Sequence, residues 1–259
     1  KLRDETVMRD GPRYLSNASL SLPSVALQAA TKETRHLFSN AFTLIAHGIS
    51  LRRATIVGDD DLRQVMELPG KPIALDIDEQ YARTVKDIYS ANIEFISRAQ
   101  AEASSEYASA FNALRRANMD VVGAIKAVKH LRKNLIPYMQ SNNPHIRREY
   151  NRFRIRIGEI LRAMAVLREN DDAIIALLSL DQIRVGILED DNQASIAADQ
   201  LIRKGAITSL MATSLINDGA YVKEVIQKLL DMNEELQRAA IMDGDSISED
   251  LALRPDELA

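Results

Sequence analysis

Apolar residues recur along this chain with the seven-residue spacing of packed helices. Two long segments alternate steps of three and four residues, and small or polar residues interrupt them only at single positions. The first stripe is Ala30, Thr34, Leu37, Ala41, Leu44, Gly48 and Leu51, and the second is Ile146, Tyr150, Phe153, Ile157, Ile160, Met164 and Leu167. Helices with such a stripe pack side by side as antiparallel bundles. We therefore predict an all-α fold.

Breaks in this pattern divide the chain into helices and units. The predicted helices cover about 23–53, 61–68, 76–99, 106–139, 144–169, 171–190 and 194–204, followed by a last helix that carries Met211 to Leu236. The clearest boundary is 141–144, where Asn143 is a good N-cap and Pro144 a good first helical residue. We expect a lead-in segment (1–22), two three-helix bundles (23–141 and 142–242) and a mobile acidic tail (243–259).

The composition supports helices and narrows the chemistry. The chain has 259 residues, of which 46% are hydrophobic and 27% charged, with few glycines, prolines and aromatic residues. The absence of cysteine excludes disulfides, thiolate metal sites and cysteine nucleophiles. A net charge of -4 gives no overall attraction to nucleic acid. No apolar run approaches the roughly 20 residues that a membrane-spanning helix needs.

Glu33 and His36 are the first candidate metal ligands. They lie one helical turn apart in a Glu-x-x-His pair, which ferritin-like di-iron sites use twice together with two further glutamates. The other histidines have no glutamate three positions earlier, so the di-iron set is incomplete. A metal-binding bundle and an ordinary helix pair are the two interpretations. No glycine-rich phosphate loop is present, and nothing brings a catalytic triad together, so we do not predict an enzyme.

The segment 130–168 contains nine lysines or arginines and only two acidic residues. Within it Arg148, Arg152 and Arg156 lie on one helix face. This face could bind an anion or dock a partner, or it could pair with the acidic stretch 171–199. Aromatic residues that could stack on bases are not interleaved with these arginines, which argues against nucleic acid.

Polar residues also occur inside the apolar stripes. Asn92 and Asn118 lie on neighbouring predicted helices, and Asp218 lies on the last one. A buried asparagine often fixes the register of packed helices at a cost in stability. Asn217-Asp218-Gly219 could alternatively cap a helix that restarts after a kink. We interpret all three polar residues as structural.

Three segments carry a family resemblance. They are Arg13-Tyr14-Leu15 with Pro23, Ala26-Leu27, Ala30 and Glu33; Val128–Leu135 with Asn143-Pro144 and Ile146-Arg147; and Ala198–Thr208 with Met211–Asp218 and Tyr221. Together they resemble the bacterial sodium/phosphate cotransporters that carry a PhoU-like domain after the membrane part. The resemblance spans roughly residues 13–238, and its last segment is the most specific.

The resemblance implies a PhoU-like regulatory domain of a sodium-dependent phosphate transporter, at the cytoplasmic face of the cell membrane. Its expected partner is a transmembrane portion upstream of Lys1, and residues such as Ile155 and Leu161 leave room for a homodimer face. PhoU proteins often bind metal clusters through an E/D-x-x-x-D motif, which does not occur here, so we predict no cofactor. The alternatives are a di-iron-like metal-binding bundle, which rests on Glu33 and His36, and a free-standing PhoU-type adaptor of phosphate signalling.

Overall fold

The regular structure is helical throughout the described part of the chain, as the apolar pattern predicts. The computed structural model describes residues 10–67, 71–103, 105–168, 178, 180–185 and 193–251. Its helices are the 3-10 helix η1 (Asn17–Ser21), α1 (Pro23–Gly48), α2 (Arg53–Val57), α3 (Leu62–Glu67), α4 (Ile77–Thr84), α5 (Lys86–Glu102), α6 (Ser105–Met139), α7 (Pro144–Arg168), α9 (Gln193–Arg203) and α10 (Ser209–Leu251). None of these helices is long and apolar enough to cross a bilayer.

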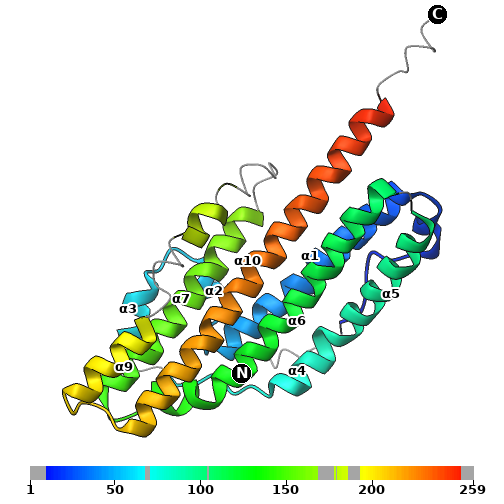
Figure 1. Cartoon of the computed structure of the whole chain (residues 1–259). Helices are drawn as coiled ribbons and strands as arrows, with labels where there is room; N and C mark the ends of the chain where they lie inside the picture. The colour runs from blue at the N-terminus through cyan, green and yellow to red at the C-terminus, as the bar shows by residue number, and fades with distance from the viewer. Residues whose placement is uncertain are drawn as a thin grey trace, which may run out of the picture.

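Four long helices, α1, α6, α7 and α10, form an elongated bundle (Figure 1). Helices α4 and α5 pack against α1, and α5 also contacts α6. Helix α9 packs on α10 and α7, while the short helices α2 and α3 pack against α7. The apolar stripes predicted for α1 and α7 are buried at every position, because these faces point into the bundle.

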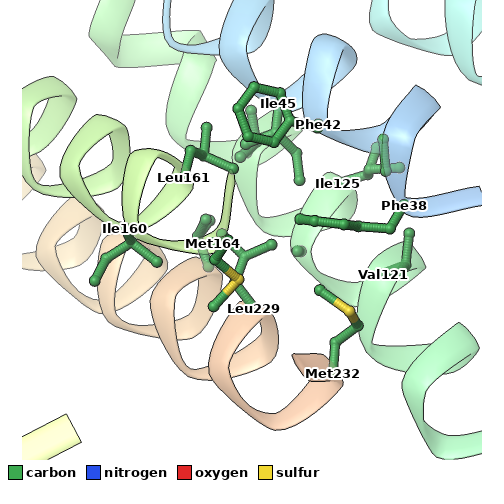
Figure 2. Close-up of a cluster of buried hydrophobic side chains, with 14 of the residues drawn as sticks. Phe38, Phe42, Ile45, Val121, Ile125, Ile160, Leu161, Met164, Leu229 and Met232 are labelled. Atoms are coloured by element: carbon green, nitrogen blue, oxygen red, sulfur yellow. The ribbon is translucent and has the colours of Figure 1, made fainter. Parts of the chain in front are cut away.

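The predicted division at 141–144 is a reversal of the chain between α6 and α7. Asn143 caps α7, since its Oδ1 accepts hydrogen bonds from the backbone N–H groups of His145 (2.9 Å) and Ile146 (3.3 Å). The helices on both sides of this reversal share one continuous core. Figure 2 shows side chains of α1, α6, α7 and α10 meeting in it, among them Phe38, Ile125, Leu161 and Leu229. The boundary therefore does not separate two cores.

The first long helix ends earlier than its stripe predicts. Helix α1 ends at Gly48 rather than near Arg53, and Ser50 has a left-handed backbone with φ of 60°. A side chain could not fit at Gly48, because a Cβ there would lie 2.3 Å from a methyl group of Val128. Leu51 is still buried, although it lies outside the helix. The apolar stripe thus continues through a change of backbone direction.

Arginines from other helices bind the carbonyl oxygens that the end of α1 and the adjoining α2 expose. Arg132 of α6 donates to His47 and Gly48, and Arg154 of α7 donates to Ile49 and Ser50. Arg162 donates in the same way to carbonyls of Thr55, Ile56 and Asp60. Positive side chains at a helix C-terminus also interact favourably with its dipole. Part of the basic excess in 130–168 is therefore structural.

Three other predicted helices differ from the structure. The helix predicted from about 76 to 99 is interrupted at the buried Val85, whose ψ of -46° is helical but whose φ of -125° is not. The last helix continues through Leu251, so the first part of the predicted mobile tail is helical; a helix propagates readily once formed. The helix predicted for 171–190 lies mostly outside the described residues. Within this segment the structure describes only 178 and 180–185, and these residues are helical.

The two asparagines in the stripes are buried and meet. Asn92 Nδ2 donates to Asn118 Oδ1 (3.1 Å), and both side-chain amides donate to the hydroxyl of Thr34, at 2.9 and 2.8 Å. The three residues come from α5, α6 and α1, and each is fully buried. Their hydrogen bonds form only when the three helices align at this level. This arrangement supports the prediction that the asparagines set the helix register.

Candidate functional site

The three arginines predicted as an anion or docking site line a groove of about 950 Å³ beside α7. Two more arginines join them, Arg147 of α7 and Arg63 of α3. Helix α9 forms the other side with residues that include Ile196, Ala197 and Gln200. We call this feature the arginine groove.

Helix α7 presents its arginines to the groove because of their spacing. Arg148, Arg152 and Arg156 recur every four residues and follow one another along one face, about 6 Å apart. The buried stripe residues, such as Tyr150 and Ile157, turn toward the core. Arg148 and Arg152 are exposed, while Arg156 is partly buried. The same periodicity thus produces the core face and the basic face.

The charge in the arginine groove is only partly neutralised. Five lining arginines face one lining carboxylate, Glu159, which lies 4.0 Å from Arg63. Arg152 forms an ion pair with Glu149 at 3.0 Å. Within the described residues, the side chains of Arg148 and Arg156 form no hydrogen bond or ion pair.

The alternative prediction, that the arginines of α7 pair with the acidic stretch 171–199, falls largely on residues outside the described ranges. Most of its acidic residues lie outside the described residues. Neither Asp181 nor Asp199, which the structure does describe, forms an ion pair with an arginine of α7. The basic residue of the stretch, Arg184, pairs with Asp231 and Glu234 of α10.

The groove also offers apolar contacts. Met66, Ile155, Ile196 and Ala197 lie among its lining residues, and Ile196 is 53% exposed. Arginine binds carboxylates and phosphates through two parallel hydrogen bonds, but it stays protonated and cannot act as an acid or base at neutral pH. The groove is therefore suited to binding an acidic, partly apolar segment.

The sequence did not reveal every residue of the arginine groove. Arg63 was missed because it belongs to a short helix far away in the chain, and only the packing of α3 on α7 brings it to the groove. Arg147 lay next to the predicted face, and its guanidinium donates to the carbonyl of Ser141 at 2.7 Å.

The candidate metal ligands Glu33 and His36 lie together and are buried, but they hold the lead-in segment. His36 Nδ1 lies 2.8 Å from Glu33 Oε1, and its Nε2 lies 3.1 Å from Asp10 Oδ2. The other oxygen of Glu33 accepts the backbone N–H groups of Arg13 (2.8 Å) and Tyr14 (2.7 Å). No group of three His, Asp or Glu side chains able to hold a metal occurs among the described residues. These contacts use the groups that a metal would need.

Acid should weaken this attachment of the lead-in segment through Asp10. Burial by itself raises the pKa of Asp10, but hydrogen bonds from Asn40 and His36, with the charges of His36 and Arg13, bring it below its ordinary 3.8. A lowered pKa gives stability that is present above pH 3.8 and is lost as pH falls through the folded-state value.

We expect Asp10→Asn to cost about 1 kcal/mol at neutral pH and to reduce the additional loss of stability below pH 4. Urea unfolding of the wild type and the variant between pH 3 and 7 measures both effects. Equal pH dependence of the two proteins would show that Asp10 does not carry this effect.

Asp218 lies at a second, smaller pocket between α6 and α10, where it is 1% exposed and accepts a hydrogen bond from Tyr150. Its helix continues without interruption through Asn217 and Gly219, so Asp218 does not cap a restarted helix. The structural interpretation of Asp218 overlooked this pocket, because the side chains of α6 that complete it are not part of an apolar stripe.

The fold and the groove define this protein as an all-helical bundle with a basic groove on one side. Comparisons with protein-family models, with curated proteins and with solved structures each find no match.

Proposed function

We propose that this chain is a PhoU-like accessory domain of a membrane sodium-dependent phosphate transporter. In this proposal it lies at the cytoplasmic face of the cell membrane. It binds an acidic segment of the transporter in the arginine groove and regulates transport by this contact, without catalysing a reaction.

The observation that carries the proposal is the incomplete neutralisation of the groove. Arg148 and Arg156 carry charges that no described residue pairs with, beside apolar side chains such as Ile196. An acidic segment with apolar residues complements both features, and charge complementarity also speeds association. The resemblance of three segments to phosphate cotransporters supplies the identity of the partner.

Charge reversal in the groove tests the proposal. Arg148→Glu/Arg152→Glu/Arg156→Glu is compared with Lys32→Glu/Arg35→Glu/Lys126→Glu, which changes the charge equally at exposed positions outside the groove. The domain and the membrane portion encoded upstream are produced as separate chains, and their association is measured in detergent. We expect the groove variant to bind at least about tenfold more weakly and the control to bind like the wild type.

Two outcomes would contradict the proposal. One is a reading frame that encodes no apolar segments of about 20 residues upstream of Lys1. The other is equal binding by the groove variant and the control variant. Raising the salt concentration should weaken the wild-type complex, because exposed charges are screened.

A further inference from the structure

A polar pocket of about 500 Å³ lies between α6 and α10, two helices that pack closely along their length. Its floor contains Asp218, and its walls include His130, Lys133 and Asn134 of α6 with Asn217 and Tyr221 of α10. These residues belong to two of the segments that carry the family resemblance, far apart in the chain. None of them lines the arginine groove.

Asp218 is held at the floor by a neighbouring helix. The hydroxyl of Tyr150, from α7, donates to its Oδ2 at 2.5 Å, and Asn134 of α6 lines the same pocket. Burial raises the pKa of Asp218 by more than the side chains of Tyr150 and Asn134 lower it. Burial and the contact with Asp218 raise the pKa of Tyr150 as well, so Tyr150 remains a donor. Burying a carboxyl group is costly, and packing alone would be served by an apolar residue.

Hydrogen-bond donors surround the pocket above Asp218. Lys133 is exposed and forms no ion pair with the described residues. The ring of His130 stacks on Tyr221, with 5.2 Å between the ring centres, which holds the imidazole at the wall. The amides of Asn134 and Asn217 can donate as well. A second acidic group besides Asp218, Glu224, lies in the lining and would disfavour a ligand with more negative charge.

This combination fits an oxyanion that still carries a proton. The oxygens of such an anion accept hydrogen bonds from Lys133 and the amides, while its O–H group donates to the carboxylate. A fully ionised oxyanion has no proton to place against Asp218, so two negative groups would face each other. Inorganic phosphate carries such a proton near neutral pH and a phosphomonoester carries one near pH 6 and below, whereas sulfate does not.

We propose that this pocket binds a singly protonated phosphate group, either free phosphate or a small phosphomonoester. Asp218 accepts the hydrogen bond of the P–O–H group, and Lys133 with the asparagine amides binds the remaining oxygens. The pocket volume leaves space for a small organic group beside the His130–Tyr221 stack. Phosphate binding in this pocket does not require docking to a transporter. If the proposed function is correct, the phosphate group is the ligand that the regulatory domain senses.

Calorimetric titration of the whole chain tests this proposal, with inorganic phosphate, glycerol phosphate and sulfate in a phosphate-free buffer at pH 7 and at pH 6, since a phosphomonoester carries the proton mainly near and below pH 6. We expect phosphate or glycerol phosphate to bind at least about tenfold more tightly than sulfate, and the tighter of the two identifies the source. Asp218→Asn should bring the preference over sulfate close to one. Lys133→Gln should weaken phosphate and sulfate alike, while Lys126→Gln, an exposed control on the same helix, should change neither.

A second titration separates this pocket from the arginine groove. The variant Arg148→Glu/Arg152→Glu/Arg156→Glu should retain the preference for phosphate over sulfate, even if it no longer binds the transporter segment. The proposal is overturned if neither phosphate nor glycerol phosphate saturates the wild type below about 10 mM. It is also overturned if the groove variant loses binding or if sulfate binds equally well. Lys133→Gln decides the matter should Asp218→Asn fail to fold.

Discussion

Replacing Arg154 with alanine is expected to lower the free energy of unfolding by about 3 kcal/mol. Arg154 is 7% exposed, and its guanidinium donates to the carbonyls of Ile49 and Ser50 at 2.9 Å each and to Asn151. Burial lowers the pKa of Arg154 to about 10, so the side chain is still protonated at neutral pH. Alanine would leave the carbonyl oxygens without donors and would open a cavity between α7 and the end of α1.

Arg152→Ala is the matched control for this prediction. Arg152 lies two residues away on the same helix, and its side chain is 58% exposed and pairs with Glu149. Exposed ion pairs contribute little, so we expect the control to change stability by no more than about 0.5 kcal/mol. Urea unfolding of both variants at pH 7 gives the comparison. Equal, small losses of stability in both variants would mean that the carbonyls of Ile49 and Ser50, just after α1, do not need the buried donor Arg154.

Arg154 also illustrates what the sequence could not predict. The stripe from Ala30 to Leu51 predicts burial correctly at each position, but it cannot show where the helix ends. That end depends on Arg132 and Arg154, which lie more than 80 residues further along the chain and bind the freed carbonyls. Helix ends that local residues determine can be predicted from the sequence more readily. Asn143-Pro144, for example, correctly predicts the start of α7.

The candidate sites differ in the same way. The spacing of Arg148, Arg152 and Arg156 predicts a shared face, because residues four apart on a helix are neighbours. The sequence could not predict which basic residues face solvent and which bind carbonyls. Arg152 and Arg154 are the same residue type two positions apart, and only the packing of the end of α1 against α7 distinguishes them. The Asp218 pocket needed the packing of α6 on α10, which joins residues nearly 90 positions apart.

Asn118→Leu is expected to lower the free energy of unfolding by about 2 kcal/mol. Leucine has a shape similar to that of asparagine, so the loss reports hydrogen bonds more than a cavity. The amide of Asn118 donates to Thr34 (2.8 Å) and to the carbonyl of Leu114 (2.7 Å), and its oxygen accepts from Asn92. Met119→Leu, at a neighbouring position that is 55% exposed, should leave stability unchanged.

The double variant Asn92→Leu/Asn118→Leu should be more stable than Asn118→Leu alone, by about 1 kcal/mol. Asn92 Oδ1 accepts no hydrogen bond from the described residues, so replacing Asn92 removes a buried acceptor that lacks a donor. A double-mutant cycle by urea unfolding measures this coupling. Losses that simply add would contradict a shared network. A recovery would instead mean that the two asparagines act as one network, which favours a single register of α1, α5 and α6 because its hydrogen bonds form only in that alignment.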